Sequence, residues 1–260
     1  RPLWTRTFPR AASPGRPPQN LSFDAPLALF GSTLFACSAG GVVFALDPAD
    51  GEPRWERDTG SPVLGTPTFA AASTEGGPSS RLFVIDQSEG GLQAFDVSDG
   101  SPIWKSEGVA RCDGSPSTAG GFVVFGSCAG ALHVFSAATG ERLRDVPLDE
   151  ESQVAGGVAL VDGAAYTGSR SGKFIRAELA TGAVTWTNTD CEGEAFSTPA
   201  VDETRVVFTA NDGGVYALDR EKGGLLWRVK LRGTPTSAVI AGDKVVTASR
   251  GTLYLLAADD

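Results

Sequence analysis

The stretch GVYALDREKGGLLW, residues 214–227, decides the fold because its residue pattern returns along the whole chain. An alternating apolar run leads to Asp219, a turn containing Gly223 follows, and a second run carries Trp227. Two such runs around a turn predict a β-hairpin. The same frame fits GVVFALDPADGEPRW (41–55), GGLQAFDVSDGSPIW (90–104), GKFIRAELATGAVTW (172–186), the degraded copy GALHVFSAATGERLR (130–144) and the shorter GTLYLLAAD (251–259).

The recurring residues occupy fixed places in each copy. A leading glycine stands six residues before an acidic residue, and a tryptophan stands eight residues after that acid. Ser136 and Arg144 replace the acid and the tryptophan in the degraded copy. The clearest members of the repeat are Gly41, Asp47, Trp55, Gly90, Asp96, Trp104, Gly172, Trp186, Gly213, Asp219 and Trp227.

Each copy belongs to a unit with four short strand-like runs, because Ser-Pro or Thr-Pro and two further apolar runs precede most leading glycines. Four strands in a period near 40 residues predict an all-β fold, a six-bladed β-propeller of four-stranded antiparallel blades in one domain, 1–260. Trp4 would lie on an N-terminal strand that closes the ring in the last blade. The expected blades span about 25–57, 66–106, 114–147, 156–188, 197–230, and 235–260 plus 1–8.

The repeated residues have structural roles in this prediction. Glycine permits the positive φ that tight turns need. The acid before the hairpin can accept hydrogen bonds from turn amides. The tryptophan on the outer strand is expected to pack between neighbouring blades, where a large side chain buries the most area.

Composition excludes several classes of protein. The net charge is −9, with no basic run, so a nucleic-acid partner is not expected. No stretch is long and apolar enough for a membrane span. The chain holds no Met and begins with RPLWTRTF, which fits removal of a signal sequence or a boundary placed inside a longer chain.

The motif G-x-(apolar)-A-L-D-x-x-x-G-x-x-x-W, with Ser-Pro or Thr-Pro upstream, resembles the pyrroloquinoline quinone (PQQ)-like repeat over essentially the whole chain. Proteins that carry this repeat include quinoprotein alcohol dehydrogenases, non-enzymatic outer-membrane assembly lipoproteins of the BamB type, and propeller sensor domains. The dehydrogenases carry adjacent cysteines and a Glu/Asn/Asp set for Ca²⁺. This sequence has no Cys-Cys pair and no set that matches the calcium site, so PQQ with calcium is the less favoured alternative.

The cysteines offer one cross-link. Cys112 precedes the first strand of the third blade and Cys128 ends its second strand, so pairing of these strands predicts a disulfide. Such a bond would favour an oxidising compartment, periplasmic or secreted. Two buried or partly exposed thiols are the alternative. Cys37 and Cys191 are expected to lie too far apart to pair.

Two motifs that suggest catalysis are better explained by the repeat. GSCAG, 126–130, resembles a nucleophile elbow with Cys128 as the nucleophile, but a strand follows it where an elbow needs a helix. His133 is the only histidine, and without a convincing partner it is expected to be an ordinary sheet residue.

The loops that leave each tryptophan strand, together with the turns between second and third strands, form the expected functional face. Their acidic residues could bind a basic peptide, or lend oxygens to Ca²⁺, although no fixed ligand spacing supports a metal. Solvated loops without a role are the alternative. The candidate binding residues are Asp58, Glu107, Arg111, Asp113, Glu150, Glu151, Asp190, Glu192 and Glu194.

Three functions follow from these observations. The favoured one is a non-catalytic, extracytoplasmic scaffold that binds a protein or peptide, with no cofactor and no metal. The second is a PQQ- and calcium-dependent dehydrogenase. The third is a ligand-sensing propeller domain of a larger receptor or enzyme.

Overall fold

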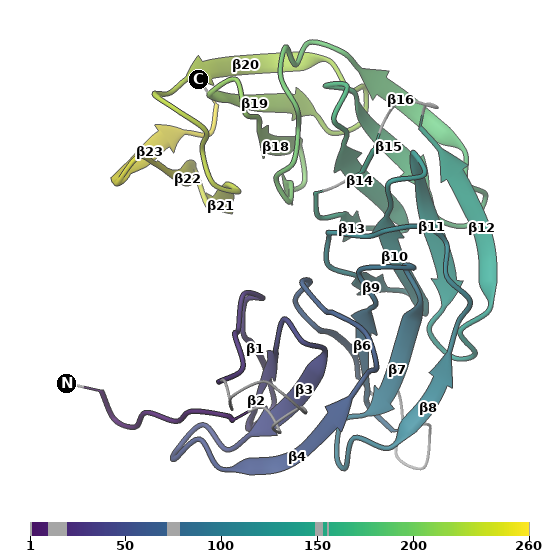
Figure 1. Cartoon of the computed structure of the whole chain (residues 1–260). Coiled ribbons are helices and arrows are strands. Elements are labelled where there is room, and N and C mark those ends of the chain that lie inside the picture. The colour runs from purple at the N-terminus through teal and green to yellow at the C-terminus, as the bar shows by residue number, and fades with distance from the viewer. Residues whose placement is uncertain (1, 10–19, 72–78, 149–152, 155, 260) are drawn as a thin grey trace. The chain divides into compact units, whose positions relative to one another are not determined.

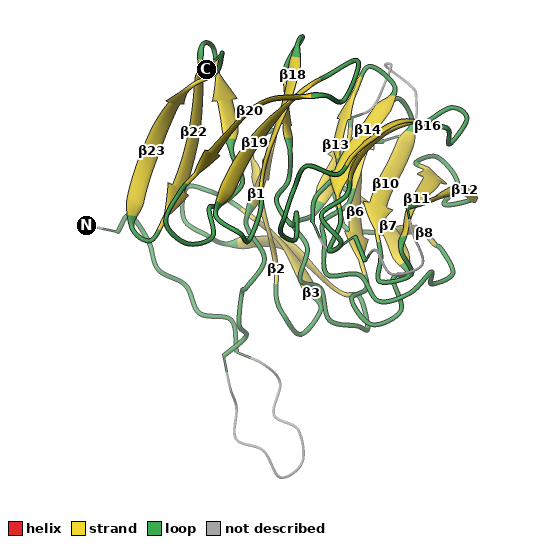
Figure 2. Ribbon diagram, turned by 90° about the horizontal axis from the view of Figure 1, so that it is seen from above, coloured by secondary structure: helices red, strands yellow, loops and turns green. Residues whose placement is uncertain are grey.

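Strands are the only regular elements in the described part of the chain (Figure 2). The computed structural model describes residues 2–9, 20–71, 79–148, 153–154 and 156–259. Within these ranges, no helix has the length and apolar character needed to cross a membrane. The sequence alternation of apolar residues with period two, broken by glycine turns, is the physical reason for an all-strand structure.

The first compact unit, residues 1–116, contains two four-stranded antiparallel sheets. The first sheet has the order β1 (Ala28–Phe30), β2 (Thr33–Cys37), β3 (Val42–Leu46) and β4 (Pro53–Asp58). The second has the order β5 (Thr68–Ala70), β6 (Arg81–Ile85), β7 (Leu92–Asp96) and β8 (Pro102–Lys105).

The second compact unit, residues 117–260, contains the remaining four sheets, and the first strands of successive sheets, β9, β13, β17 and β21, are neighbours (Figure 1). Three are four-stranded and the last is three-stranded. Their strands are β9 (Ser117–Ala119), β10 (Phe122–Gly126), β11 (Ala131–Ser136), β12 (Arg142–Pro147); β13 (Ala159–Val161), β14 (Ala164–Gly168), β15 (Phe174–Glu178), β16 (Val184–Asn188); β17 (Ala200–Val201), β18 (Arg205–Thr209), β19 (Gly214–Asp219), β20 (Leu225–Lys230); and β21 (Val239–Ala241), β22 (Lys244–Ser249), β23 (Thr252–Ala257).

Six sheets are therefore present in the order that the repeat predicts, whereas the expected blade bounds stay a prediction. The two units are described separately, and the single-domain organisation stays a prediction.

The hairpin before each outer strand has the predicted turn chemistry. In the first sheet, the Gly51 amide donates to the Asp47 carbonyl at 2.8 Å, and the Asp47 carboxylate accepts from the Ala49 amide at 2.9 Å. Gly51 has a φ of +74°, which only glycine adopts without strain. A register shift follows between Ala45 and Leu46, and an equivalent shift occurs in each of the other four-stranded sheets. The glycine and the acid thus both take part in the hydrogen bonds of this turn.

Trp55 and Trp186 pack against the next sheet along the chain, whereas Trp104 lies against Phe83 of its own sheet and its Nε1–H has no hydrogen-bond partner among the described residues. The Trp186 indole lies over Gly223 of the fifth sheet and donates from Nε1 to the Arg220 carbonyl at 3.0 Å. In the first unit, Trp55 lies over Gly100 and donates to the Val97 carbonyl at 3.0 Å. The contact that these two tryptophans share therefore combines an aromatic ring packed on a glycine with one hydrogen bond.

The degraded third copy keeps the hydrogen bond without the ring. Arg144, at the tryptophan position, donates from its guanidinium to the Leu179 carbonyl of the next sheet. Its Cδ methylene covers Gly182, since a Cβ added to Gly182 would lie 3.4 Å from it. An arginine can replace tryptophan here because its long stem covers the glycine while its N–H reaches the same kind of acceptor.

Trp4 makes the same contact at the start of the chain. Its indole lies over Gly51, and Nε1 donates to the Pro48 carbonyl at 2.9 Å. Residues 2–8 are not part of a strand, and closure of the last sheet by this segment is not shown.

Replacing Gly223 by Ala should lower the free energy of unfolding by about 2 kcal/mol or more. Gly223 has a φ of +71°, and an added Cβ would lie 2.5 Å from Trp186 Cδ2, so the change combines backbone strain with displacement of a packed indole. Gly224→Ala is the matched control, since a Cβ there meets nothing within 4 Å. Urea titration measures both variants, and equal stability of the two would contradict this account of the repeat.

Candidate binding surface

The second unit has a loop face built from the connections between sheets and from the turns between second and third strands. The Asn211 amide in the β18–β19 turn donates to the Glu194 carbonyl in the β16–β17 loop at 3.1 Å. The Ala195 amide donates to the Ser169 carbonyl in the β14–β15 turn at 3.0 Å. The β16–β17 loop is thus tied to the turns of the sheets on either side, which holds its backbone in place.

An ion-pair network supports the loop that carries Glu192. Arg228 on β20 contacts the Glu192 carboxylate at 2.9 Å and the Asp212 carboxylate at 3.0 Å. The hydrogen bond and charge of Arg228 lower the pKa of Glu192. The Tyr216 hydroxyl donates to Asp212 at 2.7 Å, and burial is the main cause that raises the pKa of Tyr216. Glu192 is therefore ionised and held in place, although its carboxylate remains exposed.

The neighbouring residues of this loop are anchored from below. The Asn188 amide donates to the Asp190 carboxylate at 2.7 Å and to the Gly223 carbonyl at 2.9 Å. Cys191 is buried, its thiol donates to the Gly193 carbonyl at 3.1 Å, and burial raises its pKa. Cys191 thus belongs to the support of the loop, whereas Asp190 and Glu192 are its outward acids.

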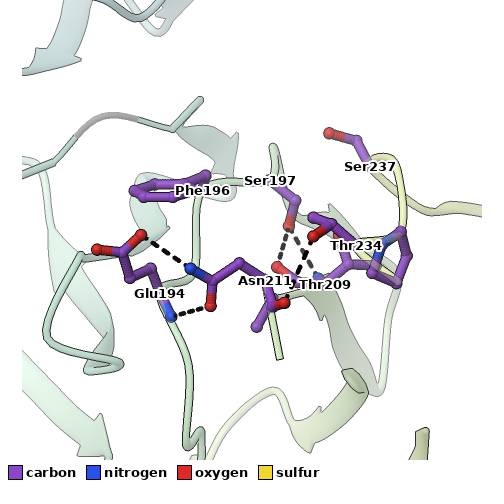
Figure 3. Close-up of a pocket in the computed structure, with 9 residues that line it drawn as sticks. Glu194, Phe196, Ser197, Thr209, Asn211, Thr234 and Ser237 are labelled. Atoms are coloured by element: carbon purple, nitrogen blue, oxygen red, sulfur yellow. Dashed lines mark hydrogen bonds between the residues drawn. The ribbon is translucent and has the colours of Figure 1, made fainter. Parts of the chain in front are cut away.

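A pocket of about 170 Å³ opens beside this loop (Figure 3). Glu194 and Asn211 bond reciprocally at its edge: the Asn211 amide donates to Glu194 Oε2, and the Glu194 backbone amide donates to Asn211 Oδ1, both at 2.8 Å. The other carboxylate oxygen of Glu194 points away from Asn211 (Figure 3). The pocket is lined by Glu194, Phe196, Ser197, Thr209, Ala210, Asn211, Thr234, Pro235 and Ser237.

Two serine hydroxyls in its walls are bonded to backbone groups. The Ser197 hydroxyl donates to the Thr209 carbonyl at 3.0 Å and accepts from the Thr209 amide at 2.8 Å. The Ser237 hydroxyl accepts from the Thr198 amide at 3.0 Å. Glu194 is the one charged residue among the lining residues, so the pocket favours a hydrogen-bond donor that carries positive charge.

The structure distributes the predicted site residues between the two units. Asp190, Glu192 and Glu194 lie together on the loop face of the second unit. In the first unit Arg111 pairs with Asp113 at 3.1 Å. Asp58, which accepts from the Gly60 amide at 2.8 Å, and Glu107 are exposed there. Glu150 and Glu151 lie outside the described residues.

The expectation that His133 lacks a partner is wrong. Its Nε2 lies 2.7 Å from Ser127 Oγ, and its Nδ1 lies 2.8 Å from Asp145 Oδ1. His133 and Asp145 face each other in the β11–β12 register, as Tyr216 and Arg228 do in the fifth sheet. Aligning the outer strands of the repeat, in addition to the third strands, would have predicted this pair.

The Ser127–His133–Asp145 order matches that of a hydrolase triad, but burial argues for a structural role. Ser127 is 0% exposed and His133 is 1% exposed, so no substrate reaches the hydroxyl. Ser127 Oγ also accepts from the Ala129 amide at 3.1 Å. Ser38 makes a similar turn bond at the equivalent place in the first sheet. The serine is therefore a turn residue of the repeat.

The predicted Cys112–Cys128 disulfide is not formed in the structure, which describes all four cysteines. Strand pairing between β9 and β10 covers only three residue pairs and does not extend back to Cys112. The Cys112 amide donates instead to the Gln87 carbonyl at 3.0 Å, and its thiol donates to the Ala110 carbonyl at 3.2 Å. The hairpin on which the prediction relied is thus shorter than expected.

Metal ligands do not gather in the described ranges, where no group of three or more His, Cys, Asp and Glu side chains could hold an ion.

Six sheets with these repeat contacts are the architecture of a β-propeller protein. A family model described as "Outer membrane protein assembly factor BamB" matches residues 1–155 and 128–260. The matches span the whole sequence, and the chain belongs to this PQQ-like, BamB-like propeller family. No curated protein sequence matches the chain significantly.

Solved structures support the fold. The crystal structure of BamB from Moraxella catarrhalis superposes with a TM-score of 0.76 at 21% identity, covering 92% of this chain and 73% of that one. The computationally designed Ika8 protein superposes with a TM-score of 0.79 at 20% identity, covering 92% and 74%. At these identities the likeness concerns the fold alone.

Thiol titration of the native protein should show one fast-reacting cysteine. Cys128 is partly exposed, whereas Cys37, Cys112 and Cys191 are buried, and burial raises the pKa of Cys37 to about 12. Thiolate is the reactive form, so a chromogenic disulfide reagent should react quickly with Cys128 and with the others only on unfolding. Unfolding without reductant should expose four thiols, and a count of two would restore the Cys112–Cys128 disulfide.

Proposed function

We propose that the protein is a non-catalytic, extracytoplasmic scaffold that binds a basic segment of a partner protein on the loop face of its second unit. The observation that carries the proposal is the pocket beside Glu194, flanked by the outward acids Asp190 and Glu192. Membership of a family described by an outer-membrane assembly factor supports both a protein partner and a location outside the cytoplasm.

A lysine or arginine side chain of the partner suits this pocket. Its charged end would donate to Glu194, and its methylene stem would lie along the pocket wall. Arg170 already lies over the Phe196 ring, with 5.0 Å between the guanidinium carbon and the ring centroid. The partner's cation would therefore be recognised by the carboxylate rather than by the ring. The net charge of −9 would add long-range attraction.

The quinoprotein alternative lacks support from the residues present. A bound quinone with calcium requires converging carboxylate and amide ligands, and the described residues bring no such acidic group together. The residues that converge in the second unit are engaged with one another, as Asp212 is with Arg228 and Tyr216.

Peptides selected by display on the wild-type protein should be rich in lysine and arginine. The double variant Glu192→Gln/Glu194→Gln should bind a selected peptide at least about tenfold more weakly, since 1.4 kcal/mol of charge attraction corresponds to a factor of ten. The matched control is Glu203→Gln/Glu221→Gln, which removes the same charge from turns at the other end of the fifth sheet. Fluorescence anisotropy measures both. Equal loss of peptide affinity in the two double variants, or selected peptides without excess basic residues, would contradict the proposal.

We also propose that residues 2–8 form the outer strand of the last sheet and close the propeller. Support comes from Trp4, which lies on Gly51 in the way that Trp55 lies on Gly100. The last sheet has three strands in the described chain, and its Leu253 and Leu255 are exposed. An added strand would satisfy the open edge of β23.

The repeat fixes the expected register of this closure. Trp55 faces Ala45 and Trp227 faces Ala217, each four residues after a leading glycine, so Trp4 should face Leu255. Thr5→Cys with Tyr254→Cys should then form a disulfide under mild oxidation, since facing residues in antiparallel strands have Cα atoms about 4.5–5.5 Å apart. Thr5→Cys with Thr252→Cys, two residues out of register, is the control. Peptide mapping by mass spectrometry detects the cross-link, and cross-linking of the control pair alone would refute the register.

A further inference from the structure

We infer that His133 is a pH-sensitive latch in the third sheet: neutral, it holds the Ser127 turn against Val154, and protonated, it releases them. The latch is a property of the folded second unit and is independent of the proposed partner.

Burial lowers the pKa of His133 and so favours the neutral ring, and the hydrogen-bond partners of the ring fit that state. Arg142 Nη2 lies 3.3 Å from His133 Nδ1, but Arg142 is paired with Asp145. The 2.8 Å contact of Nδ1 with Asp145 Oδ1 is shorter, and a carboxylate can only accept, so we assign the proton to Nδ1. Nε2 then has a free lone pair and accepts from the Ser127 hydroxyl at 2.7 Å. Ser127 thus donates to the ring and accepts from the Ala129 amide at the same time.

Ser127 connects the ring to the loop face. Its carbonyl accepts from the Val154 amide at 3.2 Å and from the Gly130 amide at 3.4 Å. Val154 is buried, and a Cβ added to Gly126 would lie 2.1 Å from Val154 Cγ1. Val154 therefore rests on the turn whose hydroxyl bonds to the histidine.

Protonation removes the acceptor that this arrangement needs. A positive charge would form on the buried ring, and Nε2–H would donate to the Ser127 oxygen, so the serine hydroxyl hydrogen would lose its acceptor in a place with no access to water. Among the described contacts, no second acceptor for the Ser127 hydroxyl is present. Opening of the turn, which admits water, relieves both problems.

The charges around the ring set the direction of the effect. Asp145 on β12 favours the protonated ring, while Arg142 on the same strand opposes it and is itself paired with Asp145. From β10 the ring faces the apolar side chain of Phe125, with 5.7 Å between ring centroids. Burial is the largest influence and lowers the pKa of His133 below its ordinary value of 6.5.

The sign of the pH dependence follows from this lowered pKa. Well above pH 6.5 the histidine is neutral in both the latched and the open turn, so pH has no effect through it. Below pH 6.5 the open turn takes up the proton first, and opening becomes more favourable. The equilibrium constant for opening rises by up to about tenfold per pH unit until the pH reaches the pKa of the latched ring.

Hydrogen exchange and NMR on the intact protein test the latch. His133 is the only histidine, so its ring resonance is identified without assignment and should titrate below 6.5. Protection of the Val154 amide should fall by about tenfold between pH 7 and pH 5, after correction for intrinsic exchange. The matched internal control is the Ala195 amide, which donates to Ser169 in the next turn of the repeat, where Ile175 takes the place of the histidine.

His133→Phe supplies the second comparison, because Phe44 occupies this position in the first sheet. The variant should remove the pH dependence at Val154 and leave Ala195 unchanged. Retained pH dependence in a folded variant would overturn the latch. If the variant does not fold, the wild-type data decide, since an ordinary histidine titration or equal pH dependence of Val154 and Ala195 would refute the inference.

Discussion

The contact on which the rest of the structure depends is a flat side chain laid on a bare glycine of the next sheet. Trp186 on Gly223 and Trp55 on Gly100 bury an indole face where no Cβ can be tolerated. The Nε1–H also reaches a carbonyl that the hairpin leaves available. Because both the positive φ and the missing side chain are needed at that position, only glycine serves, and the spacing of the whole repeat follows from this contact.

The third sheet shows what happens when that contact is relaxed. Arg144 replaces the ring and keeps only the hydrogen bond to Leu179. The same sheet has His133, bonded to Ser127 and Asp145, where the first, fourth and fifth sheets have Phe44, Ile175 and Tyr216. A buried polar network specifies one arrangement of its members more sharply than apolar packing does, and it is sensitive to protonation for the same reason.

Side chains of the inner strands are buried in packing between and within the sheets, so the loops carry the polar side chains that a partner could reach. Glu194 and Asn211 bond across two loops, and Arg228 holds Glu192 from the neighbouring strand. These bonds order the acids before any partner arrives, which reduces the entropy lost on binding. A β-propeller can thus change its partner by changing loops while its repeat contacts stay the same.

The sequence by itself determined the number and order of the sheets, the hairpin turns and the packing role of the tryptophans, since each depends on residues close together in a repeated frame. Predictions from the sequence were wrong or missing where two partners lie far apart along the chain, and where the result depended on the length of a strand. His133 meets Asp145 only through strand register, and the pocket beside Glu194 forms only where three loops converge. The Cys112–Cys128 bond was expected from a hairpin that ends too early. Local pattern fixes secondary structure, whereas contacts between distant segments are decided by how the sheets pack.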